Sequence, residues 1–355
     1  VFGEDVALAR LTTEEWAVML RGSASPAETL TLCRQLQLLA STPITIGEER
    51  VHVAPRIGIA AFPSDANEPD ALLDRALAAL ANAENKAVPA FYSETVQQRA
   101  LRHLRTEARL HDALKGAQFE FWLQPKLSLA NRALVGAEAL IRWRSPSGEW
   151  FPPGEFIPIA ESSGIIPHID RWMLQQACAF LQRWQTEARV PLRIWVNISG
   201  RHIEEAGFVA GIHDTLGRSG VSPEAMELEL TETAITEFGP ENLAKLRDLR
   251  GLGVGIALDD FGTGYCSLSY LHKLPISTLK IDKSFIDDVD RSRVNAAITQ
   301  TIVALADNFD LETVAEGVET EAQAAYLNEL GVELGQGYLF AKPMPADELL
   351  SWGMR

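Results

Sequence analysis

Several features that define common protein classes are missing from this sequence. Its three cysteines, Cys33, Cys178 and Cys266, are scattered, and no CxxC pair occurs. Scattered cysteines are typical of reduced thiols and predict neither a disulfide framework nor a cysteine-based zinc site. No stretch approaches the roughly 18 consecutive apolar residues that a membrane-spanning helix requires. The sequence therefore indicates a globular protein of a reducing compartment, and we expect a cytoplasmic location.

Positive charge is also scarce. The sequence has 32 Lys and Arg against 48 Asp and Glu, which gives a formal net charge of −16. A broad surface for duplex nucleic acid is therefore not expected, because such surfaces are basic. A small anionic ligand is compatible with this charge, since bound metal ions can reverse the local field.

The sequence has enough apolar material for a large core and for more than one domain. Hydrophobic residues make up 46% of the 355 residues, an ordinary fraction for a globular protein. The first residues read as the middle of a domain, so we expect an upstream sensory domain that is not in this chain. A membrane anchor in a longer protein is compatible with that expectation.

Strand-like and helix-like segments alternate from about residue 118 onward. Eight strand candidates, most of them followed by a helical pattern, match a (β/α)8 TIM-like barrel in order and length. The segment 126–133 between the first two candidates is too short for a helix, so we expect a hairpin and an antiparallel first strand. The candidates are residues 119–125, 134–143, 192–199, 226–231, 254–259, 278–282, 312–317 and a short piece near 335–340.

The part before the barrel shows the pattern of an α+β domain that is too short to be complete. Its helix, strand and helix are expected at residues 25–41, 52–63 and 70–87. Leucines at helical spacing then predict a connecting helix. We therefore divide the chain into a partial domain (1–92), a linker helix (93–116) and a barrel domain (117–355).

Polar side chains recur where the expected barrel strands end. The carboxyl ends of the strands meet on one face of such a barrel, so these side chains would surround a single cavity. Oxygen-rich sets favour hard divalent ions such as Mg²⁺ or Mn²⁺. The absence of an HExxH motif, and of histidine at these strand ends, argues against zinc. The set comprises Glu138, Asn197, Glu229, Asp259, Asp260, Lys280 and Glu316.

The segment GIALDDFGTGYCSL places Asp259 and Asp260 side by side at the end of an apolar strand. Adjacent carboxylates repel each other and an apolar surrounding disfavours their charge, so a compensating cation is expected. Two ions, bridged by Asp259 with Asp260 on the second, could activate water and stabilise an in-line phosphoryl displacement. Lys280 would hold that water or neutralise developing charge. Gly262 and Gly264 would let the following loop fold back over the site. Taken singly, such residues also fit helix caps, turns or a snorkelling lysine.

Motifs in the same segments resemble those of the EAL-domain cyclic di-GMP phosphodiesterases. The triplet Glu138-Ala139-Leu140 lies in GAEALIRWRSPSGEWFPPGEFIPIAESSGII. VNIS, ELTE, DDFGTGYCSLSYL, LKIDKSF, AEGVET and GQGYLFAKPMP follow in order, with Cys266 in place of the family's usual serine. The resemblance extends over about residues 119–345. It implies metal-dependent hydrolysis of cyclic di-GMP to linear pGpG in bacterial second-messenger signalling.

The resemblance also implies roles for individual residues. Glu138 and Lys280 would be essential for catalysis, with Lys280 contacting the hydrolytic water. Glu316 would be either the general base or a metal ligand, and the sequence leaves both roles open. The first metal would be held by Glu138, Asn197, Glu229 and Asp259, and the second metal by Asp259, Asp260 and Glu316. The substrate would be bound by Gln124 and Arg142. Gln336 would support the metal site, and Glu232 would hold the DDFGTGY loop.

The first part of the chain resembles the later half of a GGDEF (diguanylate cyclase) domain, through VALARLTTEEWAVMLRG and RIGIAAFPSDANEPDALLDRALAALANAENKA. Its signature reads TTEEW at residues 12–16, so two threonines replace the glycine pair that lets a hairpin approach a nucleotide closely. The RxxD motif is missing as well, because Gly3 and Val6 occupy its expected ends. We expect a degenerate domain without cyclase activity.

Three functions are compatible with these observations, and the phosphodiesterase explains most of them. We expect Mg²⁺ or Mn²⁺ as cofactor, in a two-metal site. A catalytically silent cyclic di-GMP receptor is the main alternative, because members of this family can keep binding after losing chemistry. A barrel lyase or isomerase would leave DDFGTGY unexplained. EAL-type barrels commonly dimerise, so we expect a homodimer through the barrel.

Overall fold

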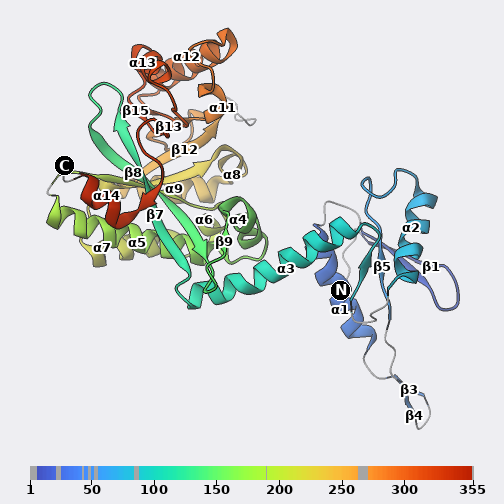
Figure 1. Ribbon diagram of the computed structural model, residues 1–355. Coiled ribbons are helices and arrows are strands. Elements are labelled where there is room, and N and C mark those ends of the chain that lie inside the picture. The colour runs from blue at the N-terminus through green and yellow to red at the C-terminus, as the bar shows by residue number, and fades with distance from the viewer. Residues whose placement is uncertain are drawn as a thin grey trace. The chain divides into compact units, whose positions relative to one another are not determined.

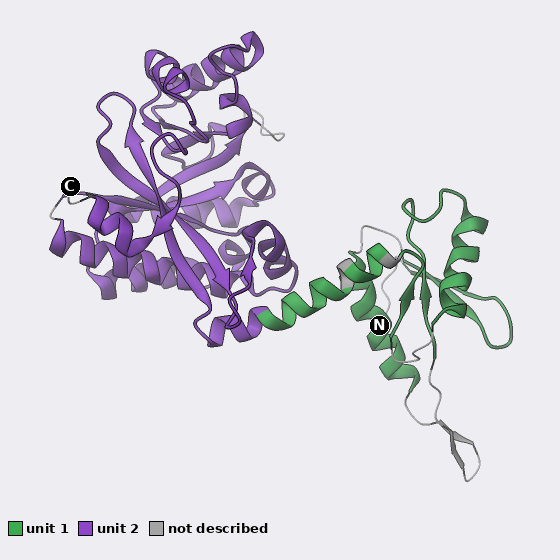
Figure 2. Ribbon diagram, in the orientation of Figure 1, with its two compact units in different colours: residues 1–109 green, residues 110–355 purple. Residues whose placement is uncertain are grey.

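The computed structural model describes residues 6–20, 25–41, 44–46, 49–51, 55–83, 88–188, 190–262 and 271–353. The chain separates into two compact units, residues 1–109 and 110–355 (Figure 2). Helix α3 (Glu94–Lys115) begins in the first unit and ends in the second.

Eight strands of the second unit close into a barrel (Figure 1). Strand β7 pairs antiparallel with both of its barrel neighbours, β8 and β15, whereas the other neighbouring barrel strands pair in parallel. The predicted barrel with an antiparallel first strand is therefore confirmed. In order around the barrel, the strands are β7 (Phe119–Ser128), β15 (Leu334–Gly335), β14 (Glu312–Ala315), β13 (Thr278–Ile281), β12 (Gly255–Phe261), β11 (Met226–Thr231), β10 (Arg193–Asn197) and β8 (Leu134–Arg144).

The hairpin of β7 and β8 explains the reversed first strand. The backbone N–H of Ser128 donates to the carbonyl of Ala133 at 2.9 Å, which closes a turn too short for a crossover helix. Two short strands, β9 (Trp150–Phe151) and β16 (Met344–Pro345), add to the outer ends of β8 and β7. Strand β10 ends before its expected limit, because Ser199 caps the next helix and accepts a hydrogen bond from the His202 N–H.

Helices surround the barrel, and their apolar faces cover its outer surface (Figure 1). Helix α5 is typical, since its buried residues Ile169, Met173 and Ala177 recur at helical spacing. Among the described residues, no helix combines the length and apolar character needed to cross a membrane. Besides the end of α3, the helices among the described residues of this unit are α4 (Pro153–Ser162), α5 (Ile166–Glu187), α6 (Gly200–Glu204), α7 (Phe208–Ser219), the 3-10 helix η1 (Pro223–Ala225), α8 (Glu232–Thr236), α9 (Pro240–Leu252), α11 (Lys283–Ile286), α12 (Arg293–Asn308), α13 (Glu321–Glu329) and α14 (Ala346–Gly353).

A small apolar cluster fills the middle of the barrel. It consists of Trp195, Ala257, Val314 and Leu334, all buried. Gly136 makes room for the indole, because a Cβ at that position would lie 2.3 Å from Trp195 Cζ3 and 2.2 Å from a carbonyl oxygen. This cluster separates two polar ends of the barrel interior.

The first unit contains short strands and two further helices. Strands β1 (Val6–Arg10) and β2 (Trp16–Leu20) form an antiparallel hairpin, and helices α1 (Pro26–Ala40) and α2 (Pro69–Ala81) match two predicted helices. The strand predicted over 52–63 is wrong in its length, because residues 55–63 contribute only β5 (Gly58–Ile59). A turn ends it early, in which the Asp65 carboxylate accepts the Ala61 N–H at 2.7 Å. The remaining strands are β3 (Ile44–Ile46), β4 (Glu49–Val51) and β6 (Ala90–Phe91), which pairs in parallel with β5.

Candidate metal centre and active site

Every strand of the barrel contributes a polar side chain to the end where the parallel strands have their carboxyl ends. We call this end of the barrel the mouth. Most contributing residues lie in the strands themselves, and two follow a strand by one residue. The mouth residues are Gln124 (β7), Glu138 (β8), Asn197 (β10), Glu229 (β11), Asp259 and Asp260 (β12), Lys280 (β13), Glu316 (after β14) and Gln336 (after β15). The structure thus brings together the polar strand-end residues singled out in the sequence, and Gln124 and Gln336 with them.

The Lys280 ammonium lies among three carboxylates. Its Nζ is 2.6 Å from Glu316 Oε1, 2.9 Å from Asp259 Oδ1 and 3.0 Å from Glu229 Oε2. The side chain is completely buried. Burial by itself would lower the pKa of Lys280, but the surrounding carboxylates, with Asp259 the strongest, raise it well above its ordinary value. Lys280 is therefore charged, and it is the common partner of these three carboxylates.

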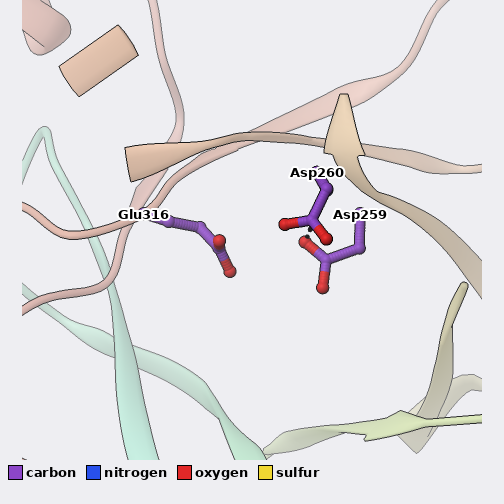
Figure 3. A group of neighbouring side chains, drawn as sticks. All are labelled: Asp259, Asp260 and Glu316. Atoms are coloured by element: carbon purple, nitrogen blue, oxygen red, sulfur yellow. Dashed lines mark hydrogen bonds between the residues drawn. The ribbon is translucent and has the colours of Figure 1, made fainter. Parts of the chain in front are cut away.

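Asp259, Asp260 and Glu316 form a compact carboxylate cluster at the mouth. One oxygen from each lies within 4.8 Å of the others, and Glu316 faces the two aspartates from across the mouth (Figure 3). Neighbouring residues of a regular strand point to opposite faces. Here the register of β12 against β13 shifts between Leu258 and Phe261, and Asp260 has a φ of 56°. This bulge turns Asp260 to the side of Asp259, whose Oδ1 accepts the Asp260 N–H at 2.9 Å.

Glu138 is held by two amide side chains. Asn197 Nδ2 donates to its Oε1 at 2.8 Å, and Gln336 Nε2 donates to its Oε2 at 2.6 Å and also to Gln124 Oε1 at 2.9 Å. Burial would raise the pKa of Glu138, but the charges of Lys280 and Lys126 outweigh it and lower that pKa to about 2. Glu138 is therefore an ionised carboxylate with a fixed orientation.

Lys126, which was not among the residues predicted from the sequence, also contacts an acid of the mouth, Glu229. This completely buried lysine lies in β7, and its Nζ is 2.5 Å from Glu229 Oε1. The segment 126–133 was predicted as a hairpin connection, whereas β7 continues to Ser128. The signal was available, since Lys126 follows Gln124 at the two-residue spacing that places side chains on one face of a strand.

Three acids of the mouth, Glu229, Glu316 and Asp260, have raised pKa values and retain protons more readily than ordinary carboxyl groups. Burial, followed by the charge of Glu138, raises the pKa of Glu229 to about 8. Burial raises the pKa of Glu316 to about 7 against the opposing effect of Lys280. Burial and then Asp259 raise the pKa of Asp260. Carboxyl and amide oxygens crowded in this way fit hard divalent cations such as Mg²⁺ and Mn²⁺, which prefer oxygen ligands and would displace the retained protons.

The remaining predicted residues lie around the mouth. Glu232 begins α8, is buried, and accepts the Gly262 N–H at 2.9 Å through Oε2, at the start of the DDFGTGY loop. Gly262 has a φ of 94°. The guanidinium of half-buried Arg142 lies 5.7 Å from the ring centre of Trp122. Residues 263–270, which include Gly264 and Cys266, lie outside the described residues.

A closed barrel with an antiparallel first strand and a mouth of carboxylates around a buried lysine defines a TIM-like barrel with a candidate metal centre. Comparison with protein-family models identifies two matches. Residues 107–343 match the EAL domain, and residues 2–88 match the diguanylate cyclase, GGDEF domain. The chain belongs to the EAL-domain family, so the resemblance seen in its motifs is confirmed. Phosphodiesterases of this family generally depend on divalent metals, and the carboxylate cluster supplies matching donors.

Two curated relatives from Pseudomonas aeruginosa align with almost the whole chain. The bifunctional diguanylate cyclase/cyclic di-GMP phosphodiesterase MucR is 37% identical over 346 residues, which are 97% of this chain and 50% of that protein. The cyclic di-GMP phosphodiesterase NbdA is 36% identical over 340 residues, 95% of this chain and 43% of that protein. This chain therefore spans half or less of the length of these relatives.

Solved structures show the same barrel. The MucR phosphodiesterase in complex with c-di-GMP is 40% identical with a TM-score of 0.66, and the match covers 69% of this chain and 99% of that one. The EAL enzyme Bd1971, in its cAMP- and cyclic-di-GMP-bound form, is 33% identical with a TM-score of 0.70. That match covers 82% of this chain and 77% of the other.

Proposed function

We propose that this chain hydrolyses one phosphodiester bond of cyclic di-GMP to give linear pGpG in bacterial second-messenger signalling. The observation that carries the proposal is the arrangement of Glu229, Asp259 and Glu316 around the buried Lys280. The names of MucR and NbdA, and the c-di-GMP bound in the MucR phosphodiesterase structure, support cyclic di-GMP as the substrate.

The mouth is suited to two Mg²⁺ or Mn²⁺ ions. Asp259 would be shared between them, and Asp260 and Glu316, which cluster with it, would complete the second site. Such ions lower the pKa of a bound water and stabilise the charge of an in-line phosphoryl transfer. The first site would be formed by Glu138, Asn197, Glu229 and Asp259.

The chain's own side chains then orient the reactants. Lys280 donates to the attacking water and neutralises charge as the bond breaks, which is worth most in a buried setting. Glu316, whose pKa near 7 suits proton transfer at neutral pH, can accept a proton from that water. Its place in the carboxylate cluster equally suits a metal ligand. Gln124 and Arg142 would hold the guanine and phosphate parts of the substrate, and arginine's fork suits phosphate.

The proposal extends to the organisation of the protein. We take residues 1–92 as a degenerate GGDEF-like domain, 93–116 as a linker helix and 117–355 as the catalytic barrel, in a cytoplasmic homodimer formed through the barrel. In the first unit, the Thr12 hydroxyl accepts the N–H groups of Glu14 and Glu15 at 3.2 and 3.1 Å. A turn held by its own side chain supports a structural hairpin in place of a cyclase site.

A turnover assay tests the proposal. The purified chain is incubated with cyclic di-GMP and Mg²⁺ or Mn²⁺, and pGpG is measured by chromatography. Wild-type protein should release pGpG only with metal, and Glu138→Ala should abolish the release. Full turnover by Glu138→Ala would contradict the assignment. Tight binding of cyclic di-GMP without turnover at saturating metal would instead support a silent receptor.

A further inference from the structure

Lys126 occupies the interior of the barrel just below the mouth. It pairs with Gly136 of β8 in the β7–β8 register, so no side chain of that partner competes for the same space. The side chain is completely buried. A buried ammonium is costly unless a charged partner compensates it. What Lys126 contacts therefore indicates its function.

The contacts of Lys126 are with Glu229 and Trp195. Its Nζ donates to Glu229 Oε1 at 2.5 Å and lies 4.4 Å from the centre of the Trp195 ring. The other carboxylate oxygen, Glu229 Oε2, is buried without a hydrogen bond to any described residue, and its nearest cation is Lys280 Nζ at 3.0 Å. The two lysines thus bind different oxygens of the Glu229 carboxylate: Lys126 contacts Oε1, and Lys280 lies beside Oε2.

Arg193 provides the contrast. Its guanidinium lies 4.7 Å from the centre of the same Trp195 ring. Arg193, however, binds Glu312 and Glu227, which belong to the end of the barrel opposite the mouth. Lys126 and Arg193 thus both lie against the Trp195 indole, but of these two cations only Lys126 contacts an acid of the mouth.

We propose that Lys126 is a positioning residue of the metal site: by binding Glu229 Oε1 it directs Glu229 Oε2 into the mouth and so sets the affinity for the divalent cation. The inference rests on the metal-dependent function proposed above. Lys126 acts through Glu229 and needs no contact with the substrate. The short charge-assisted hydrogen bond fixes the carboxylate, which would otherwise have freedom to rotate about its side-chain torsions.

The size of the effect follows from comparable metal sites. Residues that hold a metal ligand from behind typically contribute 10- to 100-fold in metal affinity or activity when they are replaced. Removing Nζ would also relieve positive charge near the cation, which alone would strengthen metal binding. We expect the loss of carboxylate orientation to outweigh that gain in metal affinity.

The test is calorimetric titration of Mn²⁺ into the metal-free full chain. Lys126→Met keeps the length of the side chain and removes its donor and charge, so Mn²⁺ affinity should fall by roughly 10- to 100-fold. Lys126→Gln keeps an N–H donor and should lose less. Arg193→Met is the matched control, since it removes a cation from the same indole, and its Mn²⁺ affinity should stay within about twofold of wild type.

Several outcomes would overturn the proposal. They are an unchanged or higher Mn²⁺ affinity in Lys126→Met, equal losses in the Met and Gln variants, or an equal loss in Arg193→Met. Where Lys126→Met does not fold, Lys126→Leu, which also lacks a donor and a charge, replaces it, and wild-type Mn²⁺ affinity in that variant would contradict the proposal. The readout is independent of turnover, so a wild-type chain that binds Mn²⁺ but leaves cyclic di-GMP intact would refute the proposed function alone.

Discussion

The two ends of the barrel interior both contain buried acids, but those acids are partnered very differently. At the end opposite the mouth, Arg193 donates to both oxygens of Glu312 at 2.7 Å and lies 3.4 Å from Glu227. Glu227 also accepts hydrogen bonds from Ser277, at 3.2 Å, and from Thr278. At the mouth, by contrast, three carboxylates converge on the single ammonium of Lys280.

This difference separates a structural network from a binding site. Buried polar groups that serve the fold are expected to be fully hydrogen-bonded, because an unpaired one costs free energy. The end around Arg193 meets that expectation. The mouth meets it less well, since Gln336 Oε1 is buried without a hydrogen bond to any described residue and Glu229 Oε2 has only the Lys280 ammonium, 3.0 Å away. The deficit at the mouth is what a bound cation would remove.

The largest expected effect comes from Lys280→Met, which removes the positive charge from the mouth. With cyclic di-GMP and saturating Mn²⁺, kcat should fall by about a thousandfold, the size expected when a buried donor to a transition-state charge is lost. Arg193→Met should keep kcat within a few-fold of wild type. A kcat within tenfold of wild type for Lys280→Met would show that the lysine is not part of the chemistry.

Removing the metal tests the contrast between the two ends of the barrel through the thermal stability of the protein. A cation at 100 times its dissociation constant should stabilise the folded protein by about 2.7 kcal/mol, because it binds only the folded state. The melting temperature should therefore rise on adding Mn²⁺ to chelator-treated wild type and to Arg193→Met. Asp259→Asn, which removes a charge from the carboxylate cluster, should lose most of that rise. An equal rise in Asp259→Asn would place the bound ion elsewhere.

The mouth was largely predictable from sequence, for a simple geometric reason. Parallel strands of a barrel end on one face, so the order of strands was enough to place Glu138, Glu229 and Lys280 together. The antiparallel first strand followed from a connection too short for a helix. The barrel and its polar mouth are thus determined by pattern and length.

What escaped prediction depends on local geometry or on distant contacts. The bulge at Asp260 arises from a register shift between β12 and β13, which no two-residue pattern reveals. Lys126 was hidden because β7 runs further than its apolar pattern suggested. The pairing of Arg193 with Glu312 joins residues 119 positions apart. Such a contact is a property of the closed barrel and not of either segment.

Arg193→Met should itself reduce the free energy of unfolding, by about 1–3 kcal/mol, because Glu312 and Glu227 lose their cationic partner. The side chain of Arg193 is 30% exposed, and solvent compensates part of the loss. Urea denaturation measures this change. A stability equal to that of wild type would show that the network opposite the mouth is not structural, and the contrast between the two ends would fail.

The stability of the metal-free protein should also depend on pH. The pKa values of Glu316 and Glu229 are raised from 4.5 to about 7 and about 8 in the folded state. Between pH 4.5 and 8 the folded protein therefore holds protons that the unfolded chain has released, so the free energy of unfolding falls as the pH rises through that window. The low pKa of Glu138 acts only below this window, where stability is lost as the pH falls.

The melting temperature of chelator-treated protein should thus decrease from pH 5.5 to 8.5. Glu316→Gln should make the melting temperature less dependent on pH near pH 7. Saturating Mn²⁺ should reverse the trend, because a cation competes with these protons and binds better as they leave. Arg193→Met should keep the slope of the wild type, since its carboxylate partners lie at the other end of the barrel. If the melting temperature depended on pH equally with and without Mn²⁺, the protons on Glu316 and Glu229 would not compete with a bound metal.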